Sequence, residues 1–192
     1  PMPGFSPPNT FADNVAEAQA LLAAAGHPGG EGLAPIEILY PTSDSGRIVC
    51  EAMQAMLRTN LGLDVRLYNQ EFKVYLETMQ QQNYDIAWSA WVGDYPDPMT
   101  FLDMNVTDGG NNRTGWSNAR YDQLVSDVQA VRDPVERAEV FYEMERLLGE
   151  EAPVIPLYFY TSVYAKSPEV KGWYPTLLDI HPFQHIWLER AE

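Results

Sequence analysis

Pro35-Ile36-Glu37-Ile38-Leu39-Tyr40 is a short run rich in branched and aromatic residues, and Pro41 ends it. Such a run predicts a β-strand. A segment with helical periodicity precedes it, beginning at Asn9 or Asp13 and ending at Gly26. This part of the chain therefore predicts a helix followed by a strand.

The same alternation continues after the strand. A second helix is predicted from its cap at Asp44 or Ser45 to its stop at Gly62. Further along, the pattern predicts a strand at 65–68, a helix at 70–80 and a strand at 84–91. Three helix–strand pairs with short connections predict a sheet with parallel neighbours and helices on its faces.

The second half of the sequence predicts more helix, and then strand. The expected elements are a helical turn at 99–104, a loop at 105–117, a helix from its cap at 118 to 131, a helix starting at 134, and strands at 154–164 and 183–189.

Composition excludes several classes of partner. Hydrophobic residues make up 45% and aromatic residues 12% of the 192 positions, which is enough for a packed core. The 27 acidic residues outnumber the 12 basic ones, so the formal net charge is -15. This charge repels nucleic acids and anionic lipids, and we expect neither as a partner. The single cysteine, Cys50, lies among apolar residues and is expected to be buried rather than nucleophilic.

The segment Trp91-Val92-Gly93-Asp94-Tyr95-Pro96-Asp97-Pro98 follows a predicted strand, at the end where α/β sheets bind ligands. A carboxylate beside an aromatic ring is a chemically suitable receptor for an ammonium group. The alternative is an ordinary loop in which Asp94 or Asp97 accepts local backbone hydrogen bonds. Spacing alone favours the ordinary loop.

Several segments, taken in order along the chain, resemble the periplasmic oligopeptide- and dipeptide-binding proteins of ABC importers, solute-binding protein family 5. The segments that carry this resemblance are 18–26, 69–76, 83–85, 91–98, 112–124, Arg137 and 152–158. Together they span nearly the whole chain. Because members of that family are much longer, the chain resembles the C-terminal portion of one.

The resemblance implies an α/β, periplasmic-binding-protein-like lobe with a mixed sheet flanked by helices, in a two-lobed protein that traps a peptide. Residues 1–9 are then an irregular end, 10–180 the ligand-binding lobe, and 181–192 a tail that returns to the other lobe. The implied role is solute capture for import rather than catalysis. The implied partners are a peptide and a membrane permease, the location is the periplasm, the state is monomeric, and no cofactor or metal is expected.

The resemblance also implies a set of ligand-facing residues. In oligopeptide binders the aspartate that matches Asp94 pairs with the peptide's N-terminal ammonium. The other matching positions supply side-chain pockets (Trp91, Phe72 and Leu76), main-chain pairing with the peptide (Ala90 and Val92) and a ligand-facing tyrosine (Tyr160).

The chain departs from the family's pattern at the other end of the ligand. Basic residues that receive the peptide carboxylate align with Met79 and Trp88, and two further polar contacts align with Pro41 and Gly46. The ammonium end is therefore retained, whereas the carboxylate end is not. A non-peptide solute, such as a nickel complex, haem, an opine or a sugar, stays open as an alternative ligand.

Two other kinds of site have candidate residues in the sequence. His181 and His185 have the spacing of two metal ligands on a helix, but Pro182 lies between them, so we expect no metal site. A hydrolase of the glycosidase type would need a pair of carboxylates, and in this sequence Asp94 and Asp97 would have to form that pair. Nucleotide-binding and nucleophile-elbow motifs do not occur in the sequence.

Four further residues were assigned structural roles. We expect Asp85 to secure the start of its strand and Arg137 to form a salt link or to be solvated. Trp173 and Trp187 are expected in a core or in an interface between lobes.

Overall fold

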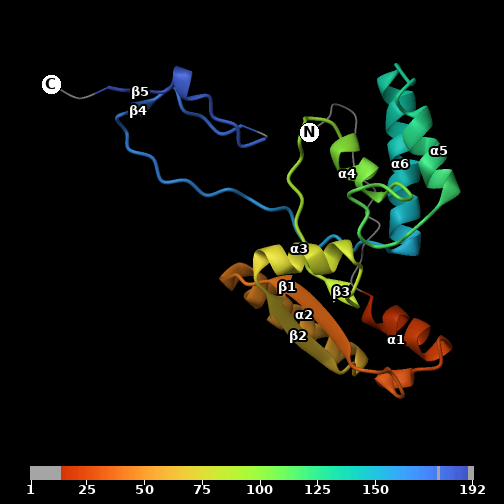
Figure 1. Cartoon of the computed structure of the whole chain (residues 1–192). Coiled ribbons are helices and arrows are strands. Elements are labelled where there is room, and N and C mark those ends of the chain that lie inside the picture. Colours follow the sequence, from red (N-terminus) through yellow and green to blue (C-terminus); the bar gives the residue numbers. More distant parts are fainter. Residues whose placement is uncertain (1–13, 177, 190–192) are drawn as a thin grey trace.

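The computed structural model describes residues 14–176 and 178–189, in which a body built on a sheet is followed by a helical body and an extended C-terminal segment (Figure 1). The helices are α1 (Val15–Ala24), α2 (Asp44–Leu61), α3 (Phe72–Gln80), α4 (Met99–Leu102), α5 (Ala119–Asp127) and α6 (Pro134–Glu151). The strands are β1 (Ile36–Pro41), β2 (Val65–Gln70), β3 (Ile86–Ala87), β4 (Val170–Lys171) and β5 (Trp187–Leu188).

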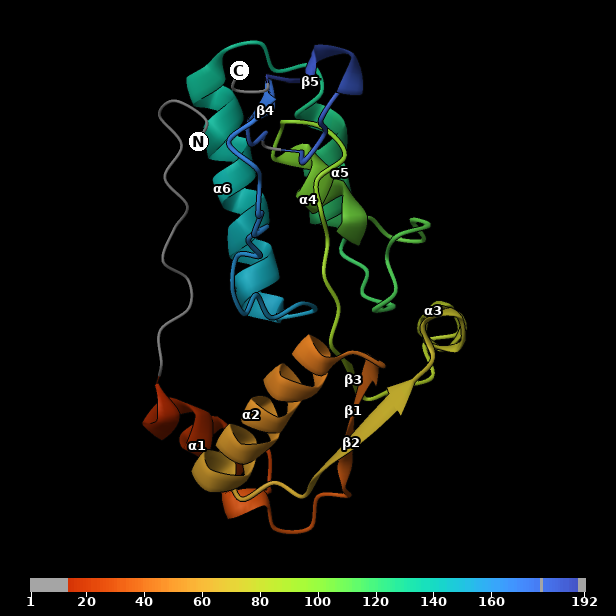
Figure 2. The same ribbon diagram turned by 90° about the vertical axis from the view of Figure 1, so that its left-hand side faces the viewer.

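Strand β1 lies at the centre of a three-stranded sheet with the order β2-β1-β3, and both of its neighbours run parallel to it. Its alternating side chains supply two separate cores, since successive residues of a strand point to opposite faces. Ile38 packs with Cys50 of α2 on one face, and Leu39 packs with Met79 of α3 on the other. Figure 2 shows α2 and α3 on opposite sides of the sheet. The predicted α/β class with parallel neighbours is confirmed.

Helix α2 is fixed at both ends by short-range contacts. The hydroxyl of Ser43 accepts a hydrogen bond from the backbone N–H of Gly46 at 3.1 Å, so Ser43 is the cap, where we expected Asp44 or Ser45. At the other end Gly62 adopts φ +71°, which favours glycine. A Cβ at this position would also collide with the backbone oxygen of Gly29.

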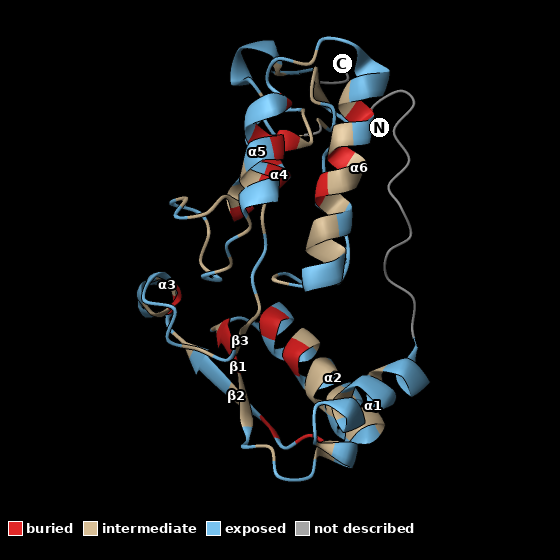
Figure 3. Ribbon diagram, turned by 90° about the vertical axis from the view of Figure 1, so that its right-hand side faces the viewer, coloured by how far each residue is buried: buried red, intermediate tan, exposed pale blue. Residues whose placement is uncertain are grey.

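The helical body has a core of its own, made where α4, α5 and α6 meet. Tyr121 and Phe141 are fully buried there, with Met144 beside them. Figure 3 shows buried positions, in red, on all three of these helices. Asn118 caps α5, as the sequence predicts. Asp133 caps α6, which begins at Pro134 as predicted.

Several predicted boundaries were wrong. Helix α3 begins at Phe72 with Glu71 as its cap, because Gln70 belongs to β2. The helix predicted from Asn118 to 131 ends at Asp127. The cap of α1 is Asn14, and the predicted start at Asn9 or Asp13 lies outside the described residues.

The predicted strands were overestimated. Only Ile86–Ala87 of the predicted strand 84–91 pairs with β1. No strand occurs at 154–164, and 183–189 contains a 3-10 turn at Phe183–His185 followed by β5. A strand requires a hydrogen-bonding neighbour as well as β-forming residues, and within the described chain these segments lack one over most of their length.

The C-terminal segment projects away from both bodies in Figure 1. Strands β4 and β5 form a small antiparallel sheet, so parallel and antiparallel pairing occur in separate sheets. Large apolar side chains are exposed along this segment: Ile155, Leu157, Tyr158, Phe159, Tyr160, Val163, Tyr174, Ile180, Phe183, Trp187 and Leu188. No helix among the described residues is long and apolar enough to cross a membrane.

Candidate ligand-binding site

The loop that connects β3 to α4 holds the two central residues of the predicted site, Trp91 and Asp94. It leaves the sheet at the C-terminal end of β3, where the backbone N–H of Trp88 donates to the oxygen of Leu39 at 2.8 Å. Figure 1 shows the loop as an extended segment between the sheet and the helices. Asp85 secures the start of this strand as predicted, because its carboxylate accepts the N–H of Glu37 at 2.9 Å.

The loop is held at Asp94 by α4. The backbone N–H of Asp94 donates to Oγ1 of Thr100 at 2.9 Å, and Thr100 is 2% exposed. Gly93 permits this close approach, because a Cβ there would lie 2.9 Å from Cγ2 of Thr100. The backbone of Asp94 is therefore held in place, whereas the residue itself is exposed.

The loop is held a second time at Asp97. Arg137 on α6 donates from Nη1 to Oδ2 at 2.6 Å and from Nη2 to Oδ1 at 2.9 Å. The same carboxylate accepts the backbone N–H of Met99 at 3.0 Å, at the start of α4. Partial burial acts to raise the pKa of Asp97, but the hydrogen bonds from Arg137 and Met99 and the charge of Arg137 outweigh it and lower this pKa.

The two carboxylates of the loop consequently have different environments. Asp97 is committed to Arg137, whereas the carboxylate of Asp94 makes no hydrogen bond or ion pair within residues 14–176 and 178–189. A general acid requires a raised pKa, and the pKa of Asp97 is lowered. The geometry thus gives Asp97 a structural role and leaves Asp94 available to a cation.

Trp91 is half-buried, and its indole Nε1 is buried without a hydrogen-bond acceptor among the described residues. Its neighbours Ala90 and Val92 are exposed, and Val92 is 63% exposed. Their backbone is outside the sheet and makes no backbone hydrogen bond among the described residues, which suits it to pairing with another extended chain.

The other predicted site residues lie on two further segments. On α3, Phe72 is 59% exposed and stacks on Tyr75 with the ring centroids 6.2 Å apart, while Leu76 packs against the core beneath this helix. Tyr160 is 72% exposed on the C-terminal segment. The structure thus brings Trp91 and Asp94 onto one loop and Phe72 and Leu76 onto one helix, with Tyr160 on a third segment.

The positions that depart from the family's pattern are filled by packed side chains. Met79 is 5% exposed in the core under α3, and Trp88 packs against the core on the α2 side. A Cβ at Gly46 would lie 3.2 Å from Cζ3 of Trp88. The ring of Trp88 therefore occupies the space that a side chain at position 46 would need.

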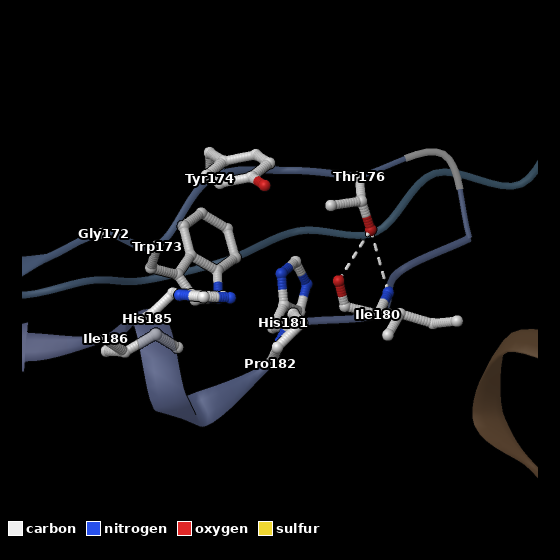
Figure 4. Close-up of a pocket in the computed structure, with 9 residues that line it drawn as sticks. All are labelled: Gly172, Trp173, Tyr174, Thr176, Ile180, His181, Pro182, His185 and Ile186. Carbon is white, nitrogen blue, oxygen red and sulfur yellow. Dashed lines mark hydrogen bonds between the residues drawn. The ribbon is translucent and has the colours of Figure 1, made fainter.

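Two pockets lie in the C-terminal segment, and neither is lined by a predicted site residue. Figure 4 shows the first, where Trp173 and His181 face one another with their ring centroids 4.7 Å apart. His181 is paired with the carboxylate of Asp179 at 2.6 Å. In the part of the chain that the structure describes, no group of three or more His, Cys, Asp or Glu side chains is placed to hold a metal ion.

Sequence reasoning missed the contacts of Thr100 and Arg137 with this loop. The sequence Asp97-Pro98-Met99 is a local signal that the Asp97 carboxylate accepts the backbone N–H of Met99, two residues on. No comparable signal identifies Arg137 as its partner, because the two residues are 40 positions apart.

Comparison with known proteins identifies the family. Residues 1–113 match the middle region of the bacterial extracellular solute-binding proteins, family 5. The chain belongs to this family. Family 5 membership accounts for both the α/β body and the loop that follows β3.

Individual relatives agree with the family assignment. The chain is 38% identical over 141 residues, 73% of its length, to the oligopeptide-binding protein OppA of Bacillus subtilis, and it covers 26% of that protein. It is 28% identical over 85% of its length to the probable deoxycholate-binding periplasmic protein YgiS of Escherichia coli, of which it covers 30%. The structure of the Escherichia coli murein tripeptide binding protein MppA matches 98% of the chain with a TM-score of 0.88 and 31% identity, and the chain covers 38% of it. The chain therefore spans less than two fifths of each of these family 5 proteins.

Proposed function

We propose that this family 5 chain forms part of an extracytoplasmic solute-binding subunit of an ABC importer, which captures peptides through their free N-terminal ammonium. The observation that carries the proposal is the carboxylate of Asp94, which has no partner among the described residues, whereas Asp97 of the same loop is paired with Arg137. One free carboxylate on the same loop as the half-buried Trp91 is suited to a single ammonium group.

The names of the relatives support a peptide ligand and a periplasmic location. Oligopeptide- and murein-peptide-binding proteins are among the relatives of this chain, and several are described as periplasmic. We propose that the subunit acts as a monomer with a membrane permease, and that it has no enzymatic activity. The engagement of Asp97 with Arg137 argues against a hydrolase that would use Asp94 and Asp97 as a pair.

We also propose that residues 10–180 belong to the ligand-binding lobe and that the tail at 181–192 packs on another lobe. The exposed apolar side chains of the C-terminal segment, such as Phe183 at 85%, support this packing. Exposed apolar surface of this extent indicates a contact with another part of a larger protein.

The test compares the intact protein with its Asp94→Asn variant. Affinity for a free-amino peptide such as trialanine should fall strongly in the variant, because removing one partner of a buried ion pair costs about 3–5 kcal/mol. Affinity for N-acetyl-trialanine should stay the same in both proteins. Isothermal titration calorimetry measures both affinities, and an equal loss for the two peptides would reject the role of Asp94.

A second candidate is a solute other than a peptide. Trp88 and Met79 fill the region where oligopeptide binders would receive a carboxylate, and the relative YgiS is described as a probable deoxycholate-binding protein. Mass spectrometry of small molecules that co-purify with the intact protein separates the two candidates. A co-purified peptide supports the first, and a co-purified non-peptide solute supports the second.

A further inference from the structure

We infer that Arg137 is a positioning residue for the proposed ammonium site. It holds the loop from Gly93 to Pro98 through Asp97, so that Asp94 is presented in a fixed direction before the ligand arrives. The inference rests on the proposed role of Asp94 and extends it to a residue on a different helix.

The first support is that the loop is held at two points, Asp94 and Asp97. At one end, the N–H of Asp94 is bonded to the buried hydroxyl of Thr100. At the other end, the carboxylate of Asp97 is held by both Nη atoms of Arg137. Two attachments three residues apart leave the intervening backbone little freedom, which lowers the entropy lost when a ligand is bound.

The second support is that Arg137 is itself fixed by the core of the helical body. Its guanidinium lies over the ring of Phe141, 4.6 Å from the centroid, and Phe141 is 0% exposed. Arg137 and Asp97 are 25% and 27% exposed, so water screens their pairing only in part. The ion pair with two hydrogen bonds therefore links Asp97 of the loop to Arg137, and Arg137 packs on the buried ring of Phe141.

The third support is the charge that Arg137 removes. Without Arg137, the carboxylate of Asp97 would keep its hydrogen bond from Met99 but would place a second uncompensated negative charge three residues from Asp94. That carboxylate would compete for the same ammonium group and would repel Asp94. With Arg137 present, Asp94 is the carboxylate of this loop that remains available.

The experiment uses the intact protein and four variants: Asp94→Asn, Arg137→Met, the double variant, and Arg137→Lys. The probes are trialanine and N-acetyl-trialanine, and the measured quantity is the dissociation constant. Arg137→Met should weaken trialanine binding by roughly tenfold to a hundredfold, since small displacements of a binding group have effects of this size. N-acetyl-trialanine binding should be unchanged. Arg137→Lys keeps the charge but not the two-point geometry, so its trialanine affinity should lie between those of the wild type and Arg137→Met.

The double variant decides between positioning and general stability. If Arg137 acts through Asp94, then Arg137→Met should cause no further loss of trialanine affinity once Asp94 is Asn. An additive loss in the double variant, or an equal loss for both peptides in Arg137→Met, would overturn the inference. If Asp94→Asn alone leaves trialanine binding unchanged, the proposed function fails, and that outcome is separate from a failure of Arg137.

A matched control and a ligand-free measurement complete the design. Arg120 forms a similar two-point pair with Glu143, at 2.8 and 2.9 Å, between α5 and α6 rather than with the loop. Arg120→Met should therefore leave trialanine affinity unchanged. In the ligand-free protein, amide hydrogen exchange at Asp94 should accelerate in Arg137→Met and not in Arg120→Met. Unchanged exchange at Asp94 in Arg137→Met would also overturn the inference.

Discussion

Arg137 and Asp97 form an ion pair with two hydrogen bonds, Nη1–Oδ2 at 2.6 Å and Nη2–Oδ1 at 2.9 Å, although 40 positions separate them in the sequence. Exposed ion pairs contribute little to stability, but this pair is three-quarters buried and has two-point geometry. It joins the loop after the sheet to the longest helix of the helical body. Its consequences should therefore be visible in stability as well as in binding.

The first prediction concerns acid stability. Because the folded pKa of Asp97 is lowered from its ordinary value of 3.8, Asp97 stabilises the fold above that value. This contribution is lost as the pH falls through the folded pKa. Asp97→Asn should lower the free energy of unfolding at neutral pH by about 1–3 kcal/mol. The difference between wild type and variant should shrink below about pH 4. Urea unfolding at a series of pH values measures it, and a difference that is independent of pH would contradict the assignment.

A second prediction concerns the hydroxyl of Tyr121, which donates to the carbonyl oxygen of Leu102 at 2.7 Å in the core. Tyr121→Phe removes this donor and leaves the carbonyl without it, which should cost about 1–3 kcal/mol. The control is Tyr68→Phe, since Tyr68 is 45% exposed and its hydroxyl has no hydrogen bond among the described residues. Chemical denaturation should show a change for Tyr121→Phe and almost none for Tyr68→Phe, and equal changes would argue against the buried bond.

The end of α2 gives a third prediction. Gly62→Ala would put a side chain in the left-handed region, at φ +71°, and against the backbone of Gly29. The expected cost is about 1–3 kcal/mol. Gly110→Ala is the matched control, since nothing lies within 4 Å of a Cβ there. Thermal unfolding should separate the two variants, and a harmless Gly62→Ala would show that this turn can rearrange.

A fourth prediction concerns Cys50, which is 0% exposed beneath the sheet. Burial raises the pKa of its thiol from 9.0 to about 11, so the reactive thiolate is rare near neutral pH. Iodoacetamide at about pH 8 should modify Cys50 slowly in the native protein and quickly in guanidinium chloride. Mass spectrometry follows the reaction, and a rate that is equal in both conditions would mean that this core opens readily.

The elements that the sequence predicted well depend on neighbours along the chain. Strand β1, the cap at Asn118 and the helix start at Pro134 involve residues within a few positions, so their signals are local. The parallel pairing of these strands could also be predicted, because a helix between two strands of one sheet favours it.

The elements predicted poorly depend on partners far away in the sequence. The residues at 154–164 favour strand, but in the described chain they have no neighbouring strand. The pair of Asp97 with Arg137 is equally non-local. The sequence could indicate the loop that contains Trp91 and Asp94, whose binding role stays a prediction, whereas the attachments that hold this loop required coordinates.

The two-sided packing of β1 limits how this protein can change in length. Ile38 and Leu39 supply cores on opposite faces, so one residue inserted before them would exchange the two sets of side chains. Insertions at the glycine-rich turn around Gly110, where space is open, would meet no such penalty. Insertions and deletions among homologues should therefore occur in that turn and be absent from the central strand.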